Sequence, residues 1–176
     1  MNKINWVVRK AKPSDAQGMI DILNPIIEEG RYTILDIPFT EEEEKAFIRA
    51  FPEKGILNVA IHPITQVVVG FQAIEPFANY THAFDHVGVI GSFVCDTFMR
   101  QGIASSMFAT SFNQAKDIGY EKLFAYVRSD NERALATYLK QGFEHVGVAK
   151  KHAKIKGKYI DEVLIEKLLA SDHKHA

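Results

Sequence analysis

The stretch RQGIAS (100–105) follows an apolar run, GVIGSFV (88–94), and leads into a segment with helical spacing. A helix N-terminus leaves backbone N–H groups without partners and carries partial positive charge, so it favours anions such as phosphate. Gly102, Ala104 and Ser105 are small enough to let a ligand come close to the backbone. The stretch therefore predicts either a phosphate-binding turn or, more simply, a tight turn from strand to helix at Gly102.

A second stretch, NERALATYLKQGF (131–143), makes the ligand interpretation more specific. Asn131, Ala134 and Tyr138 are spaced three and four apart, which places them on one face of a helix. An amide, a small side chain and a phenol are unusual for a stripe that only packs, and the two leucines of the segment are expected to do the packing beside it. Neither GxxxxGK(S/T) nor GxGxxG is present, so the common nucleotide-binding fingerprints are excluded.

Together, the two stretches resemble the GNAT (GCN5-related N-acetyltransferase) family. MRQGIA (99–104) follows the family signature Gln/Arg-x-x-Gly-x-Gly/Ala except at Met99. Residues 131–143 follow the second signature, Asn-x-x-Ala-x-x-x-Tyr-x-x-x-Gly-Phe, at every marked position. The resemblance covers nearly the whole chain. It implies an N-acetyltransferase that takes its acetyl group from acetyl-coenzyme A and needs no metal.

Periodicity and turn signals predict an α+β chain in the order β-α-α-β-β-β-α-β-α-β-β. Strands are expected at 4–11, 56–61, 66–77, 86–94, 122–127, 143–153 and 158–168, helices at about 13–28, 40–50, 101–118 and 130–141, and a loop or short strand at 29–39. Capping boxes are expected to begin two of the helices, Thr40 with Glu43 and Ser129 with Glu132. The sheet is predicted to be mixed and mostly antiparallel, with 86–94 and 122–127 parallel because a helix joins them. The resemblance adds that this pair splays apart and that helices cover both faces.

Composition favours an ordinary globular protein. The 176 residues have a net charge of -1, so no bulk attraction to nucleic acid or membrane is predicted. The single cysteine excludes an internal disulfide, and no apolar run is long enough to span a bilayer, so a cytoplasmic location is expected. No linker divides the chain, which predicts one domain (1–170) and a disordered tail (171–176).

The family resemblance implies a role for individual residues in binding acetyl-coenzyme A. Backbone N–H groups of residues 100–105 would hold the pyrophosphate, and strand residues 93–95 would pair with the pantetheine arm, which Asn131 also contacts. Tyr138 would protonate the leaving thiolate while an amine attacks the thioester directly and a backbone N–H near residues 93–95 stabilises the oxyanion. The predicted cofactor-binding residues are Phe93, Val94, Cys95, Met99, Arg100, Gln101, Gly102, Ile103, Ala104, Ser105, Asn131 and Ala134.

The general base is less well defined. Relatives often carry a glutamate on the central strand where this chain has Val89. His86, with an ordinary pKa of about 6.5, is the candidate base. The alternatives are proton loss through ordered water and a His86 that only ends a strand. Tyr138 has the corresponding alternative of a structural phenol. No metal site is predicted.

The acceptor site is expected at residues 29–39 and 150–158, with Tyr32 and Thr33 binding the substrate. Residues 22–43 are similar to the phosphinothricin acetyltransferase branch, which implies a small amino-acid-like amine as acceptor. A protein or peptide N-terminus and a non-catalytic module that binds acetyl-coenzyme A are the alternatives. The basic run 150–158 is either a solvated turn or a surface for an acidic group, and it is the only feature that favours nucleic acid. Homodimers are common in the family, so a homodimer is a further expectation.

Overall fold

The computed structural model describes residues 5–169, and the predicted order of strands and α-helices is confirmed there. The strands are β1 (Val7–Lys10), β2 (Ile56–Ile61), β3 (Val68–Pro76), β4 (Val87–Val94), β5 (Lys122–Arg128), β6 (Glu144–Ile155) and β7 (Lys158–Leu168). The α-helices are α1 (Ala16–Glu29), α2 (Glu41–Arg49), α3 (Ile103–Ile118) and α4 (Glu132–Lys140). Residues 30–39 form a loop without a strand. The single domain at 1–170 stays a prediction, and the predicted tail, 171–176, lies outside the described residues.

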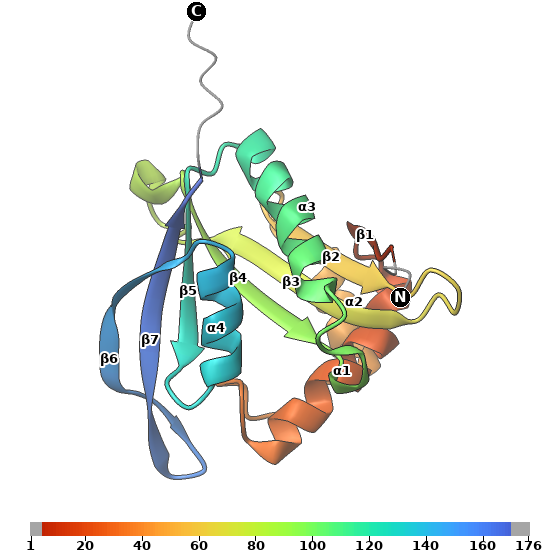
Figure 1. Cartoon of the computed structure of the whole chain (residues 1–176), viewed down its shortest axis with the longest axis horizontal. Helices are drawn as coiled ribbons and strands as arrows, with labels where there is room; N and C mark the ends of the chain where they lie inside the picture. The colour runs from red at the N-terminus through yellow and green to blue at the C-terminus, as the bar shows by residue number, and fades with distance from the viewer. Residues whose placement is uncertain (1–4, 170–176) are drawn as a thin grey trace, which may run out of the picture.

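The strands form one sheet in the order β1-β2-β3-β4-β5-β7-β6. Every neighbouring pair is antiparallel except β4 and β5, which are parallel as predicted. Their pairing covers only Val87–Val89 against Lys122–Phe124, although both strands continue well beyond it. Figure 1 shows β4 and β5 diverging toward their C-terminal ends. The sheet therefore splays at its middle.

Helices cover both faces of the sheet, as predicted. Leu57, Val59 and Phe71 pack in one core with residues of α1 and α2. Ile90 and Leu123 point to the other face, where they pack in a core that includes residues of α3 and α4. In Figure 1, α3 crosses β2–β4 and α4 lies in front of β5. Because side chains alternate along a strand, β4 contributes to both cores, which explains its apolar sequence.

Two predicted helix boundaries are confirmed. Thr40 and Glu43 form the reciprocal capping box that begins α2, with the Glu43 N–H donating to Thr40 Oγ1 at 3.3 Å. Gly119 ends α3 with a φ of 105°, in the left-handed region that glycine adopts readily.

The predicted start of α4 was wrong. Asn131, rather than Ser129, is the N-cap, because Asn131 Oδ1 accepts a hydrogen bond from the Ala134 N–H at 3.1 Å. The packing prediction for this helix also fails in part. Leu139 is 38% exposed, whereas Tyr138 is 6% exposed and packs its ring against the rings of neighbouring phenylalanines. The phenol is therefore both a core residue and a candidate site residue.

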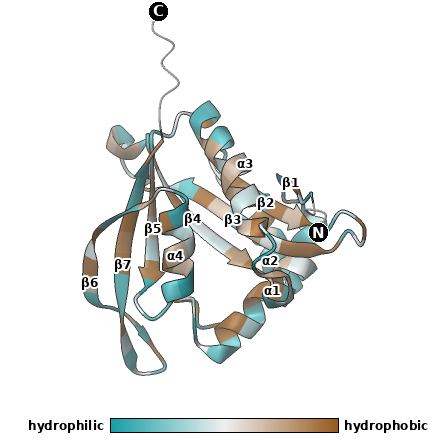
Figure 2. Ribbon diagram, viewed as in Figure 1, coloured by the Kyte–Doolittle hydropathy of each residue, from teal (hydrophilic) through white to brown (hydrophobic). Residues whose placement is uncertain are grey.

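The β6–β7 hairpin forms one edge of the sheet. Its strands alternate between hydrophobic and hydrophilic residues in Figure 2, and their pairing shifts register between Ala149 and Ala153. Val146 is 51% exposed and Tyr159 is 58% exposed. This hairpin thus presents an apolar surface of the kind that a homodimer could use, and the homodimer stays a prediction.

Candidate active site

A cavity of about 620 Å³ opens at the splay, between the C-terminal end of β4 and the facing surfaces of α3 and α4. It brings together the two sequence stretches that first suggested a ligand site. Its lining residues are Ile26, Tyr32, Ser92, Phe93, Val94, Asp96, Phe98, Met99, Arg100, Gly102, Ile103, Ala104, Ser105, Phe108, Asn131, Arg133, Ala134, Ala136, Thr137, Tyr138, Lys140 and Gln141.

The N-terminus of α3 is built to receive an anion. Gly102 is its N-cap with a φ of 85°, and no side chain caps the helix. The first intrahelical bond runs from the Ser106 N–H to the Gly102 carbonyl at 3.0 Å, so the N–H groups of the first turn are left for a ligand. A Cβ at position 102 would meet no atom within 4 Å, which leaves the approach to these donors open. Arg100, also with a positive φ (60°), shapes the turn before it.

The end of β4 offers backbone groups on its other edge. The Cys95 N–H donates to the Val69 carbonyl on the β3 side at 2.9 Å. Because N–H directions alternate along an antiparallel strand, the Val94 N–H points away from β3 toward the splay. Val94 and Phe93 line the cavity, whereas Cys95 does not. Of the predicted pantetheine-pairing residues, Val94 is thus the one with a free N–H facing the right way.

Tyr138 lies at the inner end of the cavity with its hydroxyl 3.5 Å from Ser92 Oγ. Ser92 Oγ in turn accepts a hydrogen bond from Gln72 Nε2 at 2.7 Å, which fixes its position on β4. Burial raises the pKa of Tyr138 to about 12, and the hydrogen bond with Ser92 opposes the rise. The phenol therefore keeps its proton at neutral pH, as a general acid must.

A buried arginine outside the sequence predictions holds the loop after α1 against this site. Arg128, at the end of β5, donates from Nη1 to the carbonyls of Gly30 and Thr33 at 3.0 and 2.9 Å. It also makes a two-point contact with Asp130 at 2.9 and 2.7 Å. The pKa of Asp130 is lowered by that pairing. The clamped loop carries Tyr32, which lines the cavity.

Four of the predicted site residues do not line the cavity. Gln101 has a structural contact instead: its backbone carbonyl accepts a hydrogen bond from Trp6 Nε1 at 2.8 Å. Thr33 is buried and caps its own loop through Oγ1. Cys95 packs against the core that contains residues of α1 and α2. His86 precedes β4 at the strand's N-terminal end, six residues before Ser92, which corresponds to roughly 20 Å of extended chain.

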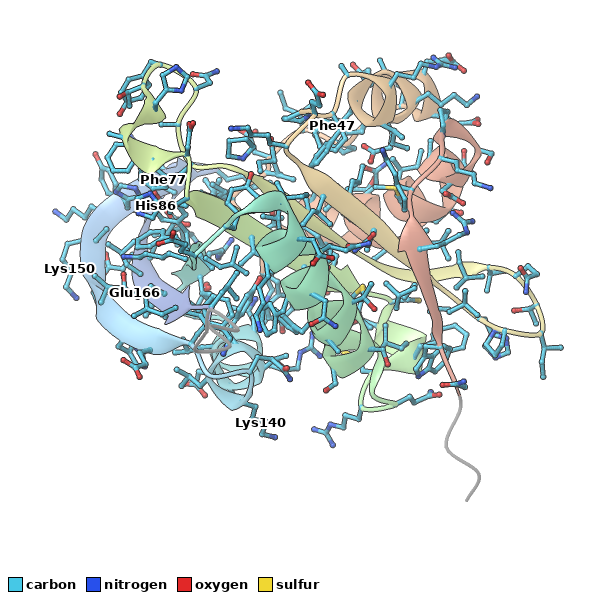
Figure 3. All side chains as sticks on the ribbon, turned by 90° about the horizontal axis from the view of Figure 1, so that it is seen from above. Phe47, Phe77, His86, Lys140, Lys150 and Glu166 are labelled. Atoms are coloured by element: carbon cyan, nitrogen blue, oxygen red, sulfur yellow. The ribbon has the colours of Figure 1, made fainter. Side chains whose placement is uncertain are left out.

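His86 is the clearest case of a predicted residue that the fold separates from the site. Figure 3 shows His86 beside Phe77, well apart from Lys140 of α4, which lines the cavity. The sequence analysis missed Lys140, Arg133 and Ser92 among the lining residues. Lys140 and Arg133 could have been found from their basic charge on the α4 segment, whereas nothing local marks Ser92.

No cluster of three or more His, Cys, Asp or Glu side chains suited to a metal occurs among residues 5–169. None of the helices in the described part of the chain is long and apolar enough to cross a membrane.

Comparison with known proteins places this geometry in a family. The family model described as "Acetyltransferase (GNAT) family" matches residues 21–143. The chain belongs to the GNAT family. It is an acetyl-coenzyme A-dependent acetyltransferase, and the resemblance stated from the sequence is confirmed. The residues that line the cavity fit such a donor, because an uncapped helix N-terminus and basic side chains suit its phosphates.

Individual relatives point to one branch of the GNAT family. A phosphinothricin N-acetyltransferase from Streptomyces coelicolor is 26% identical over 165 residues, which cover 92% of this chain and 95% of that protein. The crystal structure of a GNAT acetyltransferase from Streptococcus pneumoniae has a TM-score of 0.80 at 26% identity, covering 94% of this chain and 100% of that one. A phosphinothricin acetyltransferase from Sinorhizobium meliloti, solved in complex with AcCoA, has a TM-score of 0.85 at 17% identity, covering 94% of this chain and 89% of that one.

Proposed function

We propose that this GNAT enzyme acetylates the primary amine of a small, amino-acid-like molecule, with Tyr138 as the general acid. The observation that carries the proposal is that the uncapped α3 N-terminus and the buried Tyr138 phenol meet in one cavity at the splay. The acceptor class is supported by the likeness to the phosphinothricin N-acetyltransferase from Streptomyces coelicolor over nearly the full length of both chains.

In this mechanism the first turn of α3 binds the pyrophosphate of acetyl-coenzyme A, with Arg100, Arg133 and Lys140 contributing positive charge at the rim. The Val94 N–H is the donor placed to stabilise the oxyanion that forms when the amine attacks the thioester. Tyr138, held protonated by burial, gives its proton to the thiolate as the carbon–sulfur bond breaks. The amide nitrogen releases the proton that restores the phenol.

The test begins with calorimetric titration of the protein with acetyl-coenzyme A and coenzyme A, with NADH as a control. Binding of the first two but not of NADH is expected. Turnover is then measured as free thiol released with a panel of phosphinothricin, free amino acids and peptides with free N-termini. Turnover with peptides alone would overturn the proposal of a small-molecule acceptor. Binding of acetyl-coenzyme A without turnover of any amine would indicate a non-catalytic regulatory module.

A further inference from the structure

The sheet face opposite α3 and α4 is only partly covered. Helices α1 and α2 pack on the β1–β4 half, while β5, β7 and β6 leave their side chains on this face partly open. Tyr126 of β5 is 42% exposed, although it lies in the interior of a sheet. On β4, a Cβ at Gly91 would meet no atom within 4 Å, so there is space beside the splay on this face as well. An acceptor could therefore approach the splay from here.

A carboxylate on this face has no hydrogen-bonding partner among residues 5–169. Glu162 of β7 is 3% exposed, yet none of the side chains in the described part of the chain donates a hydrogen bond to it. His152 Nε2 is 3.8 Å from Glu162 Oε2, too far for a hydrogen bond. The residue is buried as a whole, but its carboxylate oxygens keep some contact with solvent, since Gln72 Oε1 is the fully buried side-chain polar atom without a partner among the described residues. Glu162 is thus a group with unused capacity to accept a proton.

The neighbours of Glu162 come from both adjacent strands. Arg128 lies directly across from it on β5, but its guanidinium is already committed to Asp130 and to two loop carbonyls. His152 of β6 lies in the irregular part of the hairpin and stacks on Tyr126 with ring centroids 6.2 Å apart and planes 7° from parallel. His152 is 52% exposed, so its imidazole lies between solvent and the buried carboxylate and influences it by its charge when protonated.

Arg128 contacts both the strand that carries Glu162 and the loop that lines the cavity. Arg128 faces Glu162 on one side and, on the other, holds the loop whose Tyr32 lines the donor cavity. Asn131 Nδ2 also donates to the Tyr32 carbonyl at 3.4 Å. Glu162 therefore neighbours the arginine that holds the loop carrying Tyr32.

We infer that Glu162 is the proton acceptor for the incoming amine, which reaches the splay from the face opposite α3 and α4. The inference rests on the proposed function. The Glu162 carboxylate takes one proton from the ammonium group of the acceptor and leaves a neutral amine. The amine nitrogen forms its bond to the thioester carbon, the carbon–sulfur bond breaks and Tyr138 protonates the sulfur, while the new amide nitrogen loses its extra proton to the Tyr138 oxygen. Protonated Glu162 then releases its proton to solvent.

The surroundings of Glu162 shift the pKa of its carboxyl in the direction that a general base needs. Burial raises the pKa of the Glu162 carboxyl above its ordinary range, while the positive charges of Arg128 and of protonated His152 oppose the rise. A carboxylate that holds a proton more tightly is a better base at neutral pH. It also means that activity is lost as the pH falls through the raised pKa, because protonated Glu162 cannot accept a second proton.

The decisive variant is Glu162→Gln, compared with Glu166→Gln. Glu166 lies on the same strand and the same face, but it pairs with Lys122 and is 34% exposed (Figure 3). The kcat/KM for the best amine of the panel is expected to fall at least about 100-fold in Glu162→Gln and to stay near wild type in Glu166→Gln. Hydroxylamine, which is largely unprotonated near neutral pH, bypasses the base, so its acetylation by Glu162→Gln is expected to stay near the wild-type rate.

The other outcomes separate the two hypotheses. Wild-type protein that acetylates no amine overturns the proposed function and this inference with it. Wild-type turnover with a fall of less than about tenfold in Glu162→Gln overturns the inference alone. A loss with amine and hydroxylamine alike, or of acetyl-coenzyme A affinity, assigns Glu162 to structure and also overturns it. If Glu162→Gln does not fold, His152→Gln decides: the acid limb of kcat/KM must move to higher pH, and an unchanged limb refutes the inference.

Discussion

The two sides of the splay are built in different ways. On the donor side, the α3 N-terminus and the end of β4 come from one continuous stretch, and α4 adds a face of regularly spaced side chains. On the acceptor side, the loop after α1 meets Arg128 across 98 residues of sequence, and Glu162 and His152 come from two further strands. In the proposed function, the phosphates are bound by backbone N–H groups that a short sequence pattern supplies. The amine is recognised in this proposal by side chains that only the folded sheet brings together.

The largest effect is expected on the donor side, from removal of the Tyr138 hydroxyl. Tyr138→Phe removes only the hydroxyl, so the ring still packs against Phe108 and Phe143. The expected result is a fall in kcat of about 10²–10⁴ with unchanged affinity for acetyl-coenzyme A. Steady-state kinetics and calorimetry measure the two quantities. A fall of less than about threefold would make Tyr138 a structural phenol.

The acceptor side is tested by Arg128→Gln. The change leaves two loop carbonyls without their donor and frees the half-exposed Asp130, so the free energy of unfolding is expected to fall by about 1–3 kcal/mol. In the protein that remains folded, KM for the amine should rise more than KM for acetyl-coenzyme A, because the loop loosens. Arg49→Gln, which changes an exposed arginine at the C-terminal end of α2, is the control and should change neither. Equal changes in both KM values would contradict the division into two sides.

The phosphate-binding turn is tested by Gly102→Val. A β-branched residue at a φ of 85° is strained, and its side chain fills the open approach to the α3 donors. Affinity for acetyl-coenzyme A is expected to fall about tenfold, the effect of losing one hydrogen bond to a charged group, because the side chain obstructs the α3 donors. Gly119→Val introduces similar strain at the other end of α3, where it should lower the melting temperature without changing affinity. If both variants keep wild-type affinity, Gly102 serves only as a turn.

The smallest expected effect concerns His86. Because it lies at the far end of β4 from Ser92, His86→Ala should leave kcat and the pH–rate profile unchanged. A lost acid limb in this variant would show that His86, rather than Glu162, controls deprotonation of the amine.

The sequence predicted the architecture well because each element carries its own signal. Hydrophobic periodicity gives α3, the capping box gives Thr40 as the start of α2, and β4 is apolar on both faces because it is central. The errors arose where two local signals competed. Ser129 with Glu132 matches a capping box, but Asn131 lies closer to the helix and its side chain accepts the bond. The asparagine of the family signature, Asn131, therefore also caps the N-terminus of α4.

By itself, the sequence determined the donor side: a glycine that can adopt a positive φ at a helix start, a basic and small-residue rim, and a phenol two turns into the next helix. It could do so because these groups act through local geometry, which nearby residues specify. Only the tertiary structure decided that Tyr138 is buried against Ser92, that His86 is far from the site, and that Glu162 has no side-chain hydrogen bond among residues 5–169. Burial and strand register set the pKa and the reach of a side chain, and both depend on neighbours that are distant in the chain.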